Sequence, residues 1–103
     1  MLPLIEQHRP EIAALCRRFG VRRLAVFGSA ARGTDFDPAR SDVDLLVEFE
    51  PMSPGAYVDA YFDLKEALER LFDRPVDLIA DAAIRNPYFR QGVERSQALL
   101  YAA

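Results

Sequence analysis

The chain has 103 residues, with 13 Lys and Arg against 16 Asp and Glu, and one cysteine. This length fits one domain over residues 1–103, the lone cysteine excludes an internal disulfide framework, and a net charge of −3 argues against direct binding of nucleic acid. The apolar runs are far shorter than the ~20 residues that span a membrane, and the first ten residues lack the pattern of a signal peptide. We therefore expect a cytoplasmic protein with no membrane partner.

The first third of the chain predicts a helix and then a buried strand. Apolar residues recur at helical spacing over residues 3–19, and Gly20 is well placed to end that helix. Pro10 is unfavourable inside a helix, which favours a start near Arg9 with Pro10 in the first turn. Residues 22–27 end in Leu-Ala-Val-Phe and predict a buried strand, and residues 28–33 leave room for one or two helical turns.

The remainder of the chain alternates between strands and helices. We expect a polar loop over 34–41, a strand over 43–49, an amphipathic helix over 56–72, a strand over 76–79 and a final helix over 87–101. The resulting order, α-β-α-β-α-β-α, predicts an α+β fold. It contains a small mixed β-sheet of about three strands flanked by helices.

Two aspartates stand at the start of the second predicted strand. Asp42 and Asp44 are two residues apart, so their carboxylates point to the same face of the sheet. Like charges side by side on a sheet are unfavourable, and a divalent metal is the strongest compensation. Mg²⁺ is commonly held by one or two carboxylates together with substrate phosphates. The alternative is that both are solvated charges at the strand edge.

A Gly-Ser turn follows the first predicted strand. Gly28 allows a ligand to approach the backbone closely, and the Ser29 hydroxyl can donate to a phosphate oxygen. Arg32 stands one turn later and either approaches the same phosphates or pairs with Asp35 or Asp37. A phosphate-binding turn beside a pair of metal-binding carboxylates indicates a nucleoside triphosphate site.

A third aspartate, Asp77, lies at the start of the third predicted strand, where its alternative role is to cap that strand. If Asp77 lies in the same site as Asp42, Asp44 and the Gly-Ser turn, the relative directions of the three strands follow. The Gly-Ser turn ends the first strand whereas Asp42 and Asp44 begin the second, so these two strands must be antiparallel. Asp77 also begins its strand, so the second and third strands must be parallel, with the 56–72 helix as their crossover.

These residues resemble a known family. Gly28-Ser29 with Arg32-Gly33, then Ser41-Asp42-Val43-Asp44 and a later strand aspartate, are similar to the DNA polymerase β nucleotidyltransferase superfamily. The small size and the run Ser-Asp-Val-Asp-Leu-Leu-Val-Glu-Phe most resemble its minimal nucleotidyltransferase (MNT) branch. The resemblance covers almost the whole chain, including a closing helix that in this branch often ends in Leu-Tyr-Glu, whereas here the end is Leu-Tyr-Ala-Ala.

The resemblance implies a nucleotidyltransferase fold and a role for each motif residue. Asp42, Asp44 and Asp77 would bind two Mg²⁺ ions, with Asp77 also helping to activate the nucleophile. Gly28 and Ser29 would hold the triphosphate of ATP, and Arg32 would support the site.

The resemblance also implies a partner. MNT proteins are commonly antitoxins paired with HEPN-domain toxins, and some transfer AMP to a tyrosine of the toxin. An antitoxin that only binds and occludes its toxin is the alternative, although the intact set of aspartates favours catalysis. The chain leaves no room for an acceptor domain, so the acceptor surface is expected from a partner or from self-association. An RNA-modifying transferase is disfavoured by the acidic charge.

The remaining chemically versatile residues fit structural roles. His8 and Cys16 lie on the apolar side of the first predicted helix and are expected to pack in the core. The four tyrosines are expected in the core or at an interface rather than as acceptors. Exposed aromatic residues on the last two helices would mark a surface for a protein partner.

Overall fold

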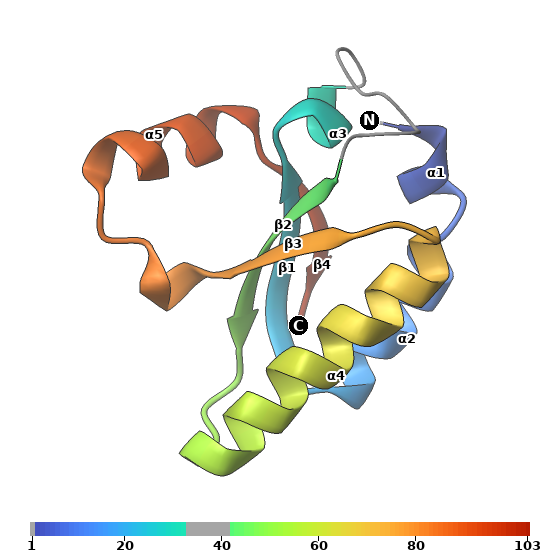
Figure 1. The fold of residues 1–103 in the computed structure, drawn as a ribbon, viewed down its shortest axis with the longest axis vertical. Coiled ribbons are helices and arrows are strands. Elements are labelled where there is room, and N and C mark those ends of the chain that lie inside the picture. The colour runs from blue at the N-terminus through green and yellow to red at the C-terminus, as the bar shows by residue number, and fades with distance from the viewer. Residues whose placement is uncertain (1, 33–41) are drawn as a thin grey trace.

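The computed structural model describes residues 2–32 and 42–103, apart from the side chains of Ser29 and Arg32. The predicted loop over 34–41 lies outside the described residues. The elements in chain order are α1 (Pro3–Glu6), α2 (Arg9–Arg18), β1 (Val21–Phe27), α3 (Ser29–Arg32), β2 (Val43–Phe49), α4 (Pro54–Phe72), β3 (Val76–Ala80), the 3-10 turn η1 (Asp81–Ala83), α5 (Pro87–Ser96) and β4 (Ala98–Ala102). The predicted α+β class is confirmed (Figure 1).

The N-terminal helical segment is divided rather than continuous. α1 stops at Glu6, and α2 begins at Arg9 with Pro10 in its first turn, which confirms the predicted start. Proline is accommodated there because the first turn of a helix needs no partner for the missing N–H. Gly20 then adopts φ +70°, a conformation that glycine tolerates best, and the chain reverses into β1.

The sheet has the predicted strand directions. Its order is β3-β2-β1-β4, with β1 antiparallel to β2 and β2 parallel to β3. α4 makes the crossover between the two parallel strands. It begins after Ser53, whose hydroxyl accepts a hydrogen bond from the backbone N–H of Ala56, and ends at Phe72, before Asp73 in the left-handed conformation.

The prediction of a final helix over 87–101 is wrong beyond Ser96. Residues Ala98–Ala102 instead form β4, which pairs antiparallel with β1. The sheet therefore has four strands rather than about three. The physical reason is that the outer edge of β1 has unpaired N–H and C=O groups. An apolar segment that forms hydrogen bonds with them stabilises the fold more than another helical turn would.

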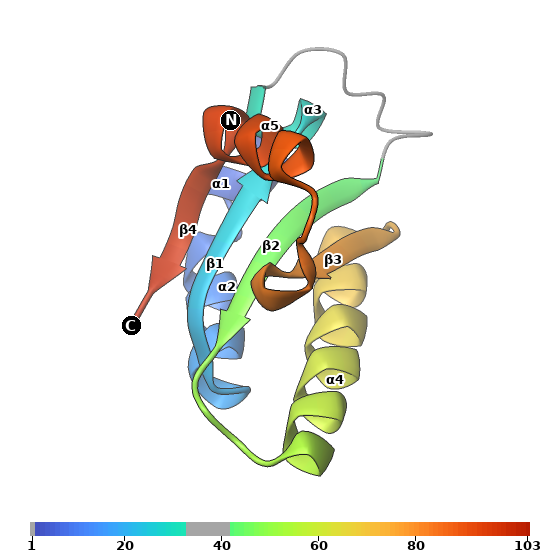
Figure 2. The same cartoon turned by 90° about the vertical axis from the view of Figure 1, so that its left-hand side faces the viewer.

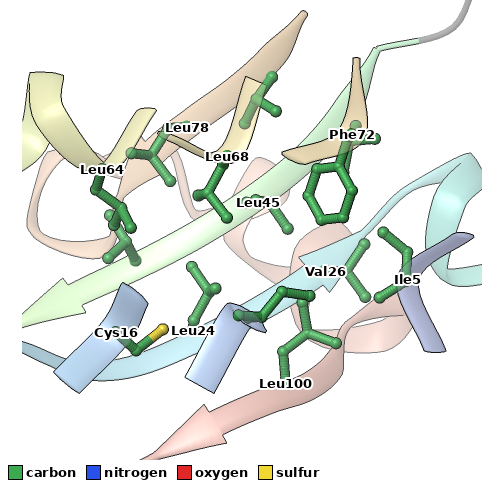
Figure 3. Close-up of a cluster of buried hydrophobic side chains, with 14 of the residues drawn as sticks. Ile5, Cys16, Leu24, Val26, Leu45, Leu64, Leu68, Phe72, Leu78 and Leu100 are labelled. Carbon is green, nitrogen blue, oxygen red and sulfur yellow. The ribbon is translucent and has the colours of Figure 1, made fainter. Parts of the chain in front are cut away.

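The two faces of the sheet are covered differently. Figure 2 shows α1, α2 and α4 behind the sheet and α5 in front of it. The larger core lies between the sheet and the helices behind it (Figure 3), and its fully buried members include Ile12, Cys16, Leu24, Val26, Val43, Leu45, Leu64 and Leu68. The smaller cluster on the opposite face consists of Phe27, Leu46 and Val93, with Ile79 and Ile84 packed against it.

The single histidine and the single cysteine pack as predicted. His8 meets Phe72 edge to face, with 6.0 Å between ring centroids. Cys16 is fully buried, and this burial raises the pKa of its thiol to about 12, so it remains protonated at neutral pH. Across residues 2–32 and 42–103, every helix is too short or too polar to cross a lipid bilayer.

Candidate active site

Strand register brings three of the predicted site residues to one end of the sheet. β2 lies between β1 and β3, and Asp44 pairs with Phe27 on one side and with Asp77 on the other. Gly28 directly follows Phe27, so the glycine turn and Asp77 flank Asp44. These groups meet because β1 and β2 are antiparallel and β2 and β3 are parallel, as predicted from the sequence.

The alternation of side chains along β2 places the acidic group on the face that α5 covers in part. Val43 and Leu45 are completely buried in the larger core, so Asp44 between them points to the opposite face. Asp42 stands directly before the strand and is exposed, as is Asp77, whereas Asp44 is half-buried. The carboxylates thus lie at an accessible end of the sheet.

The charges of these aspartates act on one another. Burial raises the pKa of Asp44 above its ordinary value of 3.8, and the negative charges of Asp77 and then Asp42 raise this pKa further. Each of these causes disfavours the ionised form of Asp44. A cation bound between the carboxylates would reverse the effect of the two neighbouring charges, because it favours ionised Asp44.

The donor set fits a magnesium ion whose coordination is shared with a substrate. Among residues 2–32 and 42–103, no three His, Cys, Asp or Glu side chains converge closely enough to hold a metal ion by themselves. Mg²⁺ is usually bound through one or two carboxylates, with water and phosphate oxygens in the other positions. Neighbouring Asp44 and Asp77 supply such a pair, and Asp42 adds negative charge beside it.

Gly28 makes room for the central carboxylate. Its φ is +69°, and a Cβ atom at this position would lie 2.8 Å from Oδ2 of Asp44. Real Cβ atoms do not approach an oxygen so closely, so any side chain here would displace the carboxylate. The glycine therefore allows the turn after β1 to lie directly against Asp44.

The last turn of α5 contacts the same glycine. The Ser96 hydroxyl accepts a hydrogen bond from the Gly28 backbone N–H at 3.4 Å and donates to the Gly92 carbonyl at 3.1 Å. Phe89 of α5 meets Phe27 edge to face at 6.3 Å between centroids. Ser96 does not stand out in the sequence, because it is 68 residues from Gly28 and belongs to no local motif.

The turn that follows Gly28 is one helical turn, α3, as predicted. It begins at Ser29 and ends at Arg32, and the Ala31 N–H donates to the Gly28 carbonyl at 3.2 Å. The predicted phosphate contacts of Ser29 and Arg32 depend on side chains outside the described part of the chain. The alternative partners of Arg32, Asp35 and Asp37, also lie outside the described residues.

Exposed aromatic residues occur on α4 and α5, where the sequence analysis expected a partner surface. Phe62 on α4 is 60% exposed and Tyr88 on α5 is 82% exposed. A cavity of about 370 Å³ lies beside Phe62, between α4 and the end of β3, and is lined by Tyr57, Val58, Tyr61, Phe62, Leu78, Ala80 and Ala83. Tyr61 has a structural role, since its hydroxyl donates a hydrogen bond to the Leu78 carbonyl.

Comparison with known sequences gives clear relatives. Residues 12–99 match the family described as Nucleotidyltransferase domain. MJ1379 of Methanocaldococcus jannaschii, provisionally named a protein adenylyltransferase, is 36% identical over 77 residues, which cover 75% of this chain and 74% of that protein. Protein adenylyltransferase MntA of Thermococcus cleftensis is 35% identical over 83 residues, which cover 81% of this chain and 76% of that protein.

Solved structures share the fold. A chain provisionally described as a minimal nucleotidyltransferase is 36% identical and superposes with a TM-score of 0.73, covering 90% of this chain and 89% of the other. The complex of a tri-AMPylated HEPN toxin with its MNT antitoxin from Shewanella oneidensis gives a TM-score of 0.64 at 19% identity. That match covers 96% of this chain and 73% of the other. At this lower identity the likeness extends to the fold alone.

Proposed function

This chain belongs to the Nucleotidyltransferase domain family, and from that premise we propose that it transfers AMP from ATP to a hydroxyl group of a partner protein. The observation that carries the proposal is the juxtaposition of Gly28, Asp44 and Asp77 across three neighbouring strands. Such a transfer needs groups that neutralise phosphate charge and groups that hold the reacting atoms in line. The two carboxylates would hold a cation that neutralises phosphate charge, and the glycine turn would let the phosphates approach the backbone.

The carboxylates are the groups that would hold magnesium. Asp42, Asp44 and Asp77 are proposed as ligands of two Mg²⁺ ions, which when bound neutralise charge on the triphosphate and polarise the attacking hydroxyl. The negative charges of Asp77 and Asp42, which raise the pKa of Asp44 in the free protein, support this assignment, since a bound cation would offset them. Asp77, on the neighbouring strand, is proposed to orient the attacking hydroxyl.

The turn after β1 is proposed to hold the phosphates of ATP. Gly28 has no side chain to keep a phosphate away from the backbone, and it lies against Asp44. The groups proposed to bind metal and the turn proposed to bind phosphate are therefore adjacent. Ser29 and Arg32 follow on the same turn and are proposed to contact the triphosphate through their hydroxyl and guanidinium groups.

The proposed acceptor is a tyrosine of a HEPN-domain toxin, for which this chain would serve as the antitoxin. Three findings support this partner: the name of the Thermococcus relative, the fold shared with the MNT antitoxin of the Shewanella complex, and the exposed aromatic side chains of Phe62 and Tyr88. Exposed aromatic residues are enriched where proteins bind one another.

The alternative is an antitoxin that acts by occlusion alone. Such an antitoxin would need the same partner surface, but it would have no use for a half-buried Asp44 whose pKa is raised by two further aspartates. Because the acidic set and the glycine that accommodates Asp44 are both present, we favour catalysis.

Asp44→Asn separates the two functions. The substitution keeps the shape of the side chain but removes the negative charge that the proposed metal requires, so we expect the variant to fold and bind the toxin without transferring nucleotide. The variant, the wild type and Asp63→Asn, an exposed aspartate of α4, are each co-expressed with the HEPN toxin. The mass of the toxin is then measured.

The expected result is a toxin heavier by one or more AMP groups with wild type and Asp63→Asn, and an unmodified toxin with Asp44→Asn. Loss of cell protection in Asp44→Asn would assign protection to catalysis. Full protection by an Asp44→Asn variant that leaves the toxin unmodified would instead establish occlusion.

A further inference from the structure

The packing of α5 fixes the last turn of this helix close to the candidate active site. Val93 packs against Phe27 and Leu46 on the sheet face opposite the larger core. Arg90 binds η1, the turn that follows β3: its guanidinium donates to the Asp81 carboxylate at 3.2 Å, to the Asp81 carbonyl at 3.1 Å and to the Ile84 carbonyl at 3.2 Å. The middle of α5 is thus held against the sheet and against η1 by contacts that do not involve Ser96.

Ser96 reaches from this fixed helix to the glycine turn. Its hydroxyl donates to Gly92 within α5, which orients the oxygen lone pairs, and accepts from the Gly28 N–H. We propose that Ser96 is a positioning residue that holds the Gly28 turn against the Asp44 carboxylate. Its effect on nucleotide binding rests on the proposed function, whereas its effect on the turn does not.

The conformation of Gly28 explains why the turn needs such a contact. Glycine loses more backbone freedom on folding than any other residue, and Gly28 is fixed at φ +69°. Asp44 restricts the turn on the side of the missing Cβ, and Ser96 restricts it through the N–H. With one of these contacts removed, the turn is free to sample other conformations, and fewer molecules present the phosphate-binding geometry.

A purely local role for Ser96 is the competing interpretation. Serine near the end of a helix often donates to the carbonyl four residues earlier, as Ser96 does to Gly92, without any tertiary consequence. The two interpretations differ in what they predict for the Gly28 amide, so this amide is the best probe.

The test compares hydrogen exchange of the Gly28 amide in the full chain, labelled with ¹⁵N-glycine; the sequence has only five glycines. We expect Ser96→Ala to speed exchange at Gly28 about three- to tenfold, the range for loss of one neutral hydrogen bond, and Ser96→Thr to restore it. Ser53→Ala is the matched control, because Ser53 also accepts one backbone N–H, at 3.3 Å, but at the start of α4. It should leave exchange at Gly28 unchanged.

Calorimetry with Mg²⁺ and AMP-PNP gives the second measurement. Dissociation constants should rise about three- to tenfold in Ser96→Ala, with recovery in Ser96→Thr and no change in Ser53→Ala. Unchanged Gly28 exchange in Ser96→Ala would overturn the proposal, as would faster exchange with unaltered nucleotide affinity. If the wild type binds no nucleotide, the proposed function fails, and the exchange comparison still decides whether Ser96 holds the turn.

Discussion

The two faces of the β-sheet carry different kinds of side chain. The face toward α1, α2 and α4 carries fully buried aliphatic side chains, whereas the face toward α5 carries a smaller apolar cluster and, at its open end, Asp44 and Asp77. Neighbouring residues on one strand show the contrast: Leu45 is completely buried in the larger core, and Asp44 points away from it. A sheet secured on one face can tolerate charge repulsion on the other.

Removing a side chain from the packed face should have the largest effect. Leu45→Ala deletes a fully buried side chain, so we expect unfolding in urea to show a loss of about 2–5 kcal/mol in the free energy of unfolding. Leu99→Ala is the control, because Leu99 is 47% exposed on β4 and should cost far less. Equal losses would contradict the assignment of the main core to one face.

Gly28→Ala should have the next largest effect and should damage the charged face directly. The substitution forces a side chain into the left-handed conformation, at about 1–2 kcal/mol, and brings its Cβ against the Asp44 carboxylate. We expect lower stability by urea unfolding and loss of Mg²⁺–ATP binding by calorimetry.

Gly20→Ala is the matched control for Gly28→Ala. Gly20 has nearly the same φ, +70°, but a Cβ there meets only the end of the flexible Met52 side chain, at 3.2 Å. Stability should fall while nucleotide binding persists. If both variants bind nucleotide equally well, the contact between Gly28 and Asp44 has no part in the site.

The charged face should respond to magnesium and nucleotide together rather than separately. Neighbouring carboxylates leave most of the Mg²⁺ shell to water and phosphate, so Mg²⁺ should tighten ATP binding tenfold or more, about 1.4 kcal/mol. Titration calorimetry with and without Mg²⁺ measures this, and Asp77→Asn should reduce the enhancement. Tight binding of Mg²⁺ to the free protein would contradict a site that is completed by phosphate.

The smallest expected effect is a gain in stability from removing a charge. The pKa of Asp44 is raised in the folded protein, so ionising this residue costs folding free energy, and this cost appears as pH rises from about 3.8 through the raised folded pKa. Asp44→Asn should therefore have a larger free energy of unfolding than wild type at pH 7, by up to about 1 kcal/mol, and the difference should shrink as the pH falls toward 3.8. If the stability difference between Asp44→Asn and wild type instead grew toward low pH, charge repulsion at Asp44 would be excluded as its cause.

The sequence predicted the parts of the fold and the site that depend on nearby residues. The spacing of Asp42 and Asp44, the glycine of the turn and the third aspartate were enough to predict strand directions that the structure confirms. The metal and phosphate roles of these residues stay predictions. Pro10 and Gly20 likewise marked helix boundaries correctly.

The parts that the sequence did not reveal depend on distant pairing. Nothing local distinguishes Ala98–Ala102 from a continued helix, because the deciding factor is the open edge of β1. The apolar run from Leu24 to Phe27 indicates a strand covered on both faces, as the structure shows, but it does not reveal whether another strand pairs with its outer edge. Ser96 escaped notice for the same reason, since its contact with Gly28 exists only after α5 has packed.

The pairing of β4 with β1 also determines how the molecule reaches its native state. Leu24 pairs with Tyr101 and Ala25 with Leu99, so the first strand along the chain forms its outer hydrogen bonds with the last strand. Loop-closure entropy makes such distant contacts late events in folding. Until β4 arrives, an apolar strand edge stays open to a second molecule, which makes edge-to-edge aggregation the main hazard for this chain while it folds.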